Sequence, residues 1–309
     1  MRILAEPDFT TRVTLVCSRD VLTAVGNALC EADSRFGQVV QRFQARESHL
    51  YELVEVPQRP EHLVPGAYHE ANAGFVQSSL KIALDLVQDR ACNLVTGPLD
   101  KRYFAAMGFP RSGHTEFLAS KLAIAGEPVM LFQGGHPLLS AVVLTRHIPL
   151  DEVKSRVTPR LLENGVKLVA RYNRRLAAMD SRYAKPMAVA GIDPHCGEWG
   201  EFSDSDLAVR QWVQALQRQG FSIEGPLAAD TLFTPSRAAA YSTIFCWYHD
   251  QGMVPVKAYA FDAAVNVTLG LPILRTSPAH GVAYDLAWKG LASTGSMANA
   301  IALAASHLE

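Results

Sequence analysis

One short pattern recurs along the chain: a continuous apolar run, then a polar or Gly- and Pro-rich turn, then helically spaced apolar residues. The runs are VTLVC (13–17), NLVTGP (93–98), SAVVLT (140–145), PMAVAG (186–191) and STIFCWY (242–248). Such runs are typical of strands buried on both faces, and their alternation with helices favours parallel pairing. We therefore expect an α/β protein with mostly parallel sheets flanked by helices.

Length and charge narrow the possible partners. The chain has 309 residues, 49% of them hydrophobic, which is enough for one large or two medium domains. The formal net charge is −1, so the chain lacks the basic surface that nucleic-acid binding requires. No apolar run approaches the ~20 residues of a membrane helix. We expect neither a nucleic-acid partner nor a membrane partner.

The five cysteines predict a reducing environment. Their number is odd, they are scattered, and no C-x-x-C motif occurs. A disulfide framework is therefore not expected. The first residues also lack the charged and apolar layout of a signal peptide. The sequence thus predicts a cytoplasmic protein.

Three of the apolar runs end near a histidine, at His147, His195 and His249. Ligands of parallel sheets bind beyond the carboxyl ends of the strands, so these imidazoles can converge there. Three neutral imidazoles commonly hold a divalent metal with an open coordination position. A single histidine after a strand is a surface residue as often as a functional one. The wide spacing of these three in the sequence gives no support to a metal site. From the residues alone, the three histidines are either metal ligands or ordinary surface residues.

Five motifs in register resemble one known family. They are VTGPLDK (95–101), SGHTEFLA (112–119), GIDPHCGE (191–198), YHDQGMVPVK (248–257) and VNVTLGLPILRTSPAHGVAYDLA (265–287). From about residue 65 to the C-terminus, the chain resembles the 4-hydroxythreonine-4-phosphate dehydrogenase (PdxA) family.

The resemblance implies an architecture. Members share the fold of isocitrate and isopropylmalate dehydrogenases, with two α/β domains around a cleft and a homodimer that completes each active site. We expect residues 1–115 and 255–309 to form the first domain, on the cofactor side. Residues 116–254 should form the second, with the metal ligands and the dimer contact.

The resemblance also implies an activity. It is the NAD-dependent, divalent-metal-dependent oxidation and decarboxylation of 4-phosphohydroxy-L-threonine to 3-amino-2-oxopropyl phosphate, in pyridoxal phosphate biosynthesis. NADP is an alternative cofactor. By ligand type the expected metal is zinc, with magnesium, manganese or cobalt left open. Such a metal can favour loss of the hydroxyl proton and stabilise the oxygen that becomes negative when CO2 leaves.

Carried over motif by motif, the resemblance assigns roles to named residues. The three metal ligands are His147, His195 and His249, with His249 reaching the metal of the other subunit. The small phosphorylated substrate contacts His114, Thr115, Lys257, Asn266 and Arg275. His280 and Gly281 lie on the cofactor side. Lys257 and Asp250 are the catalytic candidates, and Asp230 matches a position near the metal.

Residue chemistry fits several of these roles. Arg275 can offer a bidentate fork to an anion, and Lys257 a point charge or a relayed proton. Both lie in apolar, strand-like stretches, LPILRT and PVKAYAF, which argues against ordinary surface charges. Asn266 is a poor strand former inside VNVTLG, so a ligand contact would explain it. Asp250 can orient a ligand histidine.

The chain departs from the family at two places. Members open with a strand and a segment of the type G-[DE]-P-A-G-I-G-P-E, and this chain has no such segment, so we expect the first strand and its loop to be missing. Asp193 stands in GIDPH where Asn is usual, which adds a negative charge near His195.

Other functions remain open. Paralogues oxidise 4-phospho-D-threonate or 4-phospho-D-erythronate with the same metal and anion groups, and the sequence does not separate them from the leading interpretation. A more distant branch oxidises aromatic cis-dihydrodiol carboxylates; the intact GHTE motif, Asn266 and Arg275 argue against it. The alternative from another class is a non-catalytic protein that binds a metal and a phosphorylated ligand, which the missing loop suggests.

Overall fold

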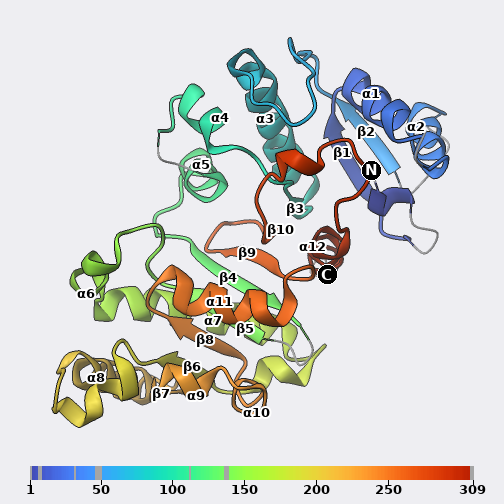
Figure 1. Cartoon of the computed structure of the whole chain (residues 1–309). Helices are drawn as coiled ribbons and strands as arrows, with labels where there is room; N and C mark the ends of the chain where they lie inside the picture. Colours follow the sequence, from blue (N-terminus) through green and yellow to red (C-terminus); the bar gives the residue numbers. More distant parts are fainter. Residues whose placement is uncertain are drawn as a thin grey trace. The chain divides into compact units, whose positions relative to one another are not determined.

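The chain forms two compact units in the computed structural model, which describes residues 2–5, 9–30, 33–45, 51–110, 113–135 and 139–306. Unit 1 comprises Met1–Ala123 and Pro272–Glu309, and unit 2 comprises Ile124–Leu271. The α-helices and β-strands named below are labelled in Figure 1, where the colours run from blue at the N-terminus to red at the C-terminus. Ser112 of the SGHTE motif lies outside the described residues.

Unit 1 contains two parallel strand pairs, β1 with β2 and β3 with β10. Figure 1 shows α1 and α2 beside β1 and β2. The elements of unit 1 are η1 (Arg2–Ala5), β1 (Val13–Cys17), α1 (Arg19–Cys30), α2 (Arg35–Ala45), β2 (Tyr51–Glu55), η2 (Glu70–Asn72), α3 (Ala73–Arg90), β3 (Leu94–Val95), α4 (Lys101–Ala106), α5 (His114–Lys121), β10 (Arg275–Pro278), η6 (Tyr284–Leu286) and α12 (Gly295–Ala305).

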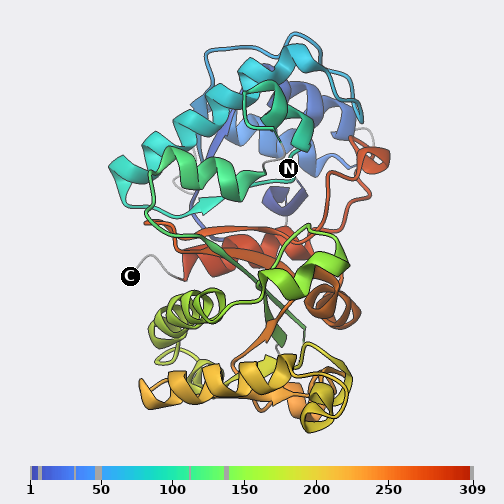
Figure 2. The same ribbon diagram turned by 90° about the vertical axis from the view of Figure 1, so that its left-hand side faces the viewer.

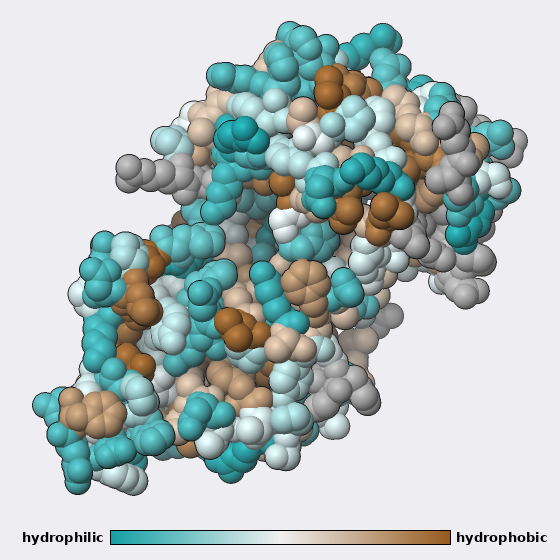
Figure 3. Space-filling view, in the orientation of Figure 1, coloured by the Kyte–Doolittle hydropathy of each residue, from teal (hydrophilic) through white to brown (hydrophobic). Residues whose placement is uncertain are grey.

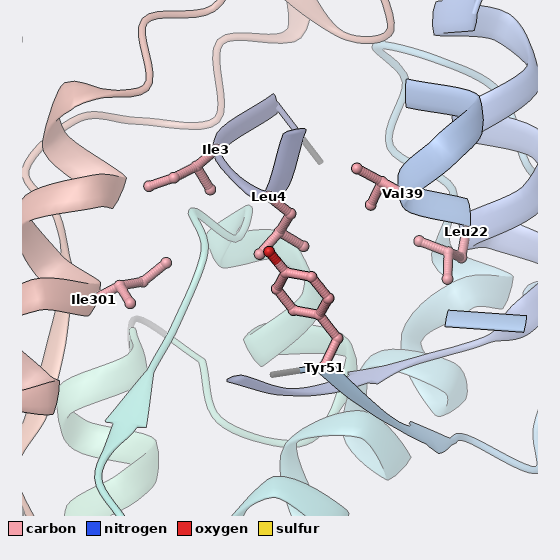
Figure 4. Packing of buried hydrophobic residues seen from close by; sticks show 6 residues of the cluster. All are labelled: Ile3, Leu4, Leu22, Val39, Tyr51 and Ile301. Carbon is pink, nitrogen blue, oxygen red and sulfur yellow. The ribbon is translucent and has the colours of Figure 1, made fainter. Parts of the chain in front are cut away.

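A buried cluster joins the two ends of the chain within unit 1. Side chains from η1, α1, α2, β2 and α12 meet there (Figure 4). Each such aliphatic or aromatic side chain contributes about 1.5–3 kcal/mol when fully buried. This packing holds the C-terminal helix against the N-terminal elements. The cluster consists of Ile3, Leu4, Leu22, Val39, Tyr51 and Ile301.

Unit 2 contains a six-stranded part of a sheet, in the order β9-β4-β5-β8-β6-β7. Strands β5, β8, β6 and β7 are parallel neighbours, whereas β4 is antiparallel to both β9 and β5. The elements are β4 (Val129–Gly134), β5 (Leu139–Val143), η3 (Leu150–Glu152), α6 (Val153–Arg156), α7 (Pro159–Leu176), η4 (Ser181–Ala184), β6 (Met187–Ala190), η5 (Pro194–Gly200), α8 (Ser205–Arg218), β7 (Ile223–Leu227), α9 (Ala229–Leu232), α10 (Pro235–Ala238), β8 (Thr243–Cys246), α11 (His249–Ala260) and β9 (Val265–Leu269).

Helices α7 and α11 cover opposite faces of the sheet of unit 2 (Figure 2). Successive β8 side chains alternate between them, as the pleat requires. Phe245 lies against Gly165 of α7, and Cys246 lies against Gly252 of α11. Both strand residues are fully buried. The continuous apolar run of β8 therefore reflects burial on two faces, and the expected α/β fold with mostly parallel strands is confirmed.

The boundaries between the units differ from those predicted from the sequence, which lay after residue 115 and before residue 255. Strand β9 pairs with β4 along its whole length, from Val129 opposite Leu269 to Gln133 opposite Val265. The chain therefore stays in unit 2 as far as Leu271. As a result Lys257 and Asn266 belong to unit 2, together with the three histidines.

The surface is mixed. On the face shown in Figure 3, hydrophobic residues form small groups between hydrophilic ones. The large exposed apolar side chains of unit 2 include Leu150, Trp199, Val254 and Phe261. None of the described helices is both long enough and apolar enough to span a bilayer.

Candidate active site

Three neighbouring strands of unit 2 carry the predicted metal ligands beyond their carboxyl ends. His147 follows β5, His195 follows β6, and His249, the first residue of α11, follows β8. Because β8 pairs in parallel with both β5 and β6, the three ends share one edge of the sheet. Ligands of parallel sheets bind at such an edge. The fold therefore provides the convergence that the sequence pattern required.

His147 and His249 come together within one chain. Their ring centroids are 5.4 Å apart, with 38° between the ring planes. His249 Nδ1 lies 2.6 Å from Asp250 Oδ1, and a neutral ring donates its Nδ1–H to that carboxylate. The hydrogen bond leaves Nε2 as the nitrogen with a free lone pair. Asp250 thus has the geometry of a residue that orients a ligand histidine.

His195 lies among carboxylates. Its Nδ1 is 3.1 Å from Glu198 Oε1, and its Nε2 is 3.9 Å from Asp230 Oδ2. Five consecutive residues, from His195 to Trp199, have φ between 46° and 68°. Four of them are not glycine, and each such residue costs on the order of 1–2 kcal/mol in this region. A strained left-handed turn therefore presents the imidazole.

Asp193, the residue that departs from the family, is neutralised locally. Its carboxylate is 2.8 Å from Lys154 Nζ and accepts a hydrogen bond of 2.5 Å from Ser203 Oγ. Burial raises the pKa of Asp193, but the hydrogen bonds from Lys154 and Ser203 outweigh it, so the pKa lies below its usual value. The extra negative charge is thus paired with a lysine.

The imidazole donors of these three residues suit a divalent metal. In the ranges that the structure describes, no three His, Cys, Asp or Glu side chains are close enough together to hold a metal ion. The structure shows a His147–His249 pair, and His195 with its two carboxylates. The three-histidine ligand set stays a prediction.

Unit 1 contains a buried cation. Arg275, the first residue of β10, is only 3% exposed, and its Nε and Nη2 donate to Thr96 Oγ1 at 3.1 and 2.6 Å. Burial lowers its pKa to about 10, so it keeps its charge at neutral pH. No role was predicted for Thr96 from its place in the VTGP motif. Its hydroxyl fixes the guanidinium that we expect to bind an anion.

His114 lies close to this cation. It begins α5, and its ring meets Phe104 edge-on at 5.1 Å. Burial, together with the positive charge of Arg275, lowers the pKa of His114 to about 3. The imidazole is therefore neutral at physiological pH and can only exchange hydrogen bonds with a ligand. Thr115 is buried beside it.

Two further substrate candidates lie in unit 2. Lys257 is exposed in the last turn of α11, so the expectation that PVKAYAF is strand-like is wrong. Its buried neighbours, Met253, Val256 and Ala260, follow helical spacing. Asn266 is 7% exposed in β9, and its Oδ1 has no hydrogen-bond partner among the described residues. A buried acceptor of this kind suits a ligand that donates a hydrogen bond.

The cofactor-side candidates occupy the loop after β10. His280 and Gly281 are both exposed, and His280 Nδ1 lies 2.9 Å from Gly281 O. A Cβ added at Gly281 would meet no described atom within 4 Å. The backbone is therefore open to a ligand, as a nucleotide site needs, and the role of both residues stays a prediction.

The family model described as "Pyridoxal phosphate biosynthetic protein PdxA" matches residues 9–304. The chain belongs to the PdxA family. A 4-hydroxythreonine-4-phosphate dehydrogenase of Xanthobacter autotrophicus is 43% identical over 251 residues, which are 78% of this chain and 69% of that protein. The enzyme of the same name from Zymomonas mobilis is 38% identical over 81% of this chain and 74% of its own length.

Solved structures agree with the PdxA assignment. The 4-hydroxythreonine-4-phosphate dehydrogenase of Klebsiella pneumoniae superposes with a TM-score of 0.77 at 27% identity, covering 99% of this chain and 94% of that one. A terephthalate 1,2-cis-dihydrodiol dehydrogenase of Burkholderia xenovorans reaches a TM-score of 0.63 at 23% identity, over 96% and 98% of the two chains. This second likeness concerns the fold alone.

Proposed function

We propose that the chain is an NAD-dependent, metal-dependent dehydrogenase that oxidises and decarboxylates 4-phosphohydroxy-L-threonine. The products are 3-amino-2-oxopropyl phosphate, CO2 and NADH, and the reaction serves pyridoxal phosphate biosynthesis. The observation that carries the proposal is the family match over residues 9–304, with relatives of that name at 38–43% identity. NADP is the alternative cofactor.

The buried groups of unit 1 suit an anionic substrate. Arg275 is a cation with little water around it, so its charge acts on a substrate oxyanion more strongly than a surface charge would. Thr96 holds its guanidinium in a fixed orientation. A neutral His114 adds a hydrogen bond without a second charge, and Thr115 adds a hydroxyl. We assign these groups to the phosphate or carboxylate of the substrate.

The groups of unit 2 suit the chemical step. His147, His195 and His249 would hold the metal, and Asp250 fixes the ring of His249. When bound, a divalent metal supplies Lewis acidity to the substrate oxygens, and NAD supplies the hydride acceptor. Lys257 is assigned to substrate binding and proton transfer. The buried Oδ1 of Asn266 is assigned to a substrate donor such as the amino group.

The proposed assembly is a cytoplasmic homodimer with active sites shared between subunits. Two observations support it. Among the described residues of one chain, no three His, Cys, Asp or Glu side chains are arranged so that they could hold a metal ion. Exposed apolar side chains also occur at Val254 of α11, the helix that begins with His249, and at Phe261, which follows this helix. A second subunit could supply the missing ligand and cover such residues.

The test is NADH formation by the purified chain. We would offer 4-phosphohydroxy-L-threonine and 4-phospho-D-erythronate in parallel, with NAD, before and after chelation and after zinc is added back. Turnover of the first substrate that is lost with chelation and restored by zinc is the expected result. Turnover of the second alone would assign the chain to the sugar-acid paralogues. Metal binding without turnover of either would favour the non-catalytic alternative.

A further inference from the structure

One residue of the YHDQG motif has no role in the site described so far. Gln251 lies in the first turn of α11, two residues after His249. Its Oε1 accepts the backbone N–H of Trp247 at 2.8 Å, and its Nε2 donates to the carbonyl of Gly191 at 2.7 Å. One amide therefore joins the end of β8 to the residue that follows β6.

The turn that leads to His195 is held by side chains along its length. Ala190 O accepts from the indole Nε1 of Trp247 at 2.7 Å. Both oxygens of Asp206, which is 1% exposed, accept backbone N–H groups, from Ile192 at 2.9 Å and from Asp193 at 3.0 Å. Asp206 belongs to α8. Gln251 is the member of this set that comes from the helix bearing His249.

The chemistry of the amide matches this position. One end must accept a hydrogen bond and the other must donate one, which glutamine can do and glutamate or methionine cannot. The N–H of Trp247 lies just before the helix, where backbone donors lack an intrahelical partner. The N-cap residue, Tyr248, offers no side-chain hydrogen bond. Gln251 therefore fixes the start of α11 as well as the neighbouring turn.

We infer that Gln251 is a positioning residue for metal binding. It holds the His195 turn and the His249 helix start in one fixed relation, so that each imidazole is presented in a constant orientation. Residues that orient metal ligands from behind typically change metal affinity by about 10- to 100-fold when they are replaced. The inference rests on the proposed metal-dependent function.

The test compares Gln251→Met with Gln217→Met. Gln217 makes the same kind of bond elsewhere in unit 2, from its Nε2 to Ile223 O at 2.7 Å, and touches neither histidine segment. Zinc affinity would be measured by competition with a chromophoric chelator. Ligand geometry would be read from the visible spectrum of the cobalt-loaded protein, and stability from the melting temperature. A second variant, Gln251→Glu, keeps the acceptor for Trp247 N–H and replaces the donor to Gly191 O with a negatively charged oxygen.

We expect both Gln251 variants to bind zinc about 10- to 100-fold more weakly than the wild type and to show an altered cobalt spectrum. Gln217→Met should lower the melting temperature without changing either metal readout. Wild-type affinity and spectrum in Gln251→Glu would overturn the inference, including when Gln251→Met fails to fold. If the wild-type protein itself binds no zinc, the proposed metal-dependent function fails, and the inference with it.

Discussion

His114 and Arg275 show how burial sets the charge of single residues. Both lie in unit 1, and both lose solvation there, but with different outcomes. Burial lowers the pKa of Arg275 to about 10, so it remains a cation. Burial and the Arg275 charge lower the pKa of His114 to about 3, so it remains neutral. An anion that binds here therefore meets one cation and one neutral hydrogen-bonding ring.

The His114 pKa makes a prediction about stability and pH. The unfolded chain binds a proton at His114 below about pH 6.5, and the folded chain only near pH 3. The unfolded state thus binds more protons in this window, so stability falls as the pH falls, by up to about 1.4 kcal/mol per pH unit. In His114→Asn this contribution is absent. Urea unfolding of both proteins from pH 8 to pH 4 should show a shallower acid loss for the variant.

The region above pH 7 provides the control for this experiment. There the imidazole is neutral in both states, so the stability difference between wild type and variant should be constant. Equal slopes for the two proteins between pH 6.5 and pH 4 would contradict a neutral, desolvated His114.

At the scale of elements, the YHDQG motif shows how far the sequence could lead. It predicted correctly that the apolar run contains a buried strand, which ends at Cys246, three residues before His249. It wrongly predicted a strand for PVKAYAF, because the apolar residues Pro255, Val256, Ala258 and Ala260 are dense enough to hide the helical period. Burial at Met253, Val256 and Ala260 becomes visible only when α11 packs on β5 and β8.

The residues that we expect to bind an anion could be predicted only in part from the sequence motifs. Arg275 and His114 follow from motifs that resemble the family. Thr96 could not be found in this way, because its partner is 179 residues away in the sequence. The pairing of β3 with β10, which places Leu94 opposite Arg275, brings them together. Gln251 and Gly191 are likewise joined only by the parallel order of β6 and β8.

The close packing of α11 makes a prediction for Gly252. A Cβ at this position would lie 3.1 Å from Cys246 Sγ and 3.2 Å from Val143 Cγ2, and both neighbours are buried. Overpacking of this kind costs about 1–3 kcal/mol, against about 1 kcal/mol gained in helix propensity. We expect Gly252→Ala to lower the free energy of unfolding by about 1 kcal/mol. Denaturant unfolding of chelator-treated protein would measure this without a metal contribution.

Gly126, which lies outside the helices, supplies a control for the steric effect, because a Cβ there would meet no described atom within 4 Å. Gly126→Ala should change stability by less than about 0.5 kcal/mol. If Gly252→Ala were as stable as the wild type, the contact between α11 and the sheet would be looser than its geometry indicates.

At the scale of the whole molecule, the predicted functional residues divide between the two units. The histidines 147, 195 and 249 lie in unit 2, with Lys257 and Asn266. His114, Thr115 and Arg275 lie in unit 1. The sequence predicted a discontinuous first domain whose second segment begins at residue 255, whereas unit 1 resumes at Pro272. The difference arises because the pairing of β9 with β4 has no local sequence signature. Which subunit supplies each histidine to the proposed metal is a question about the proposed dimer.

Mixed dimers answer that question. If His249 serves the partner's metal, a doubly tagged dimer of His195→Ala and His249→Ala chains contains one site with both changes and one intact site. It should regain about half of the wild-type kcat per dimer, although each variant alone is inactive. In the opposite arrangement, in which each chain supplies all three histidines to its own site, each site of this mixed dimer carries one change and stays inactive. A dimer of wild type with a chain carrying both changes reverses the pattern. It should be inactive when sites are shared and about half active when each chain supplies all three histidines. The two dimers together therefore assign the ligands, because no single arrangement activates both.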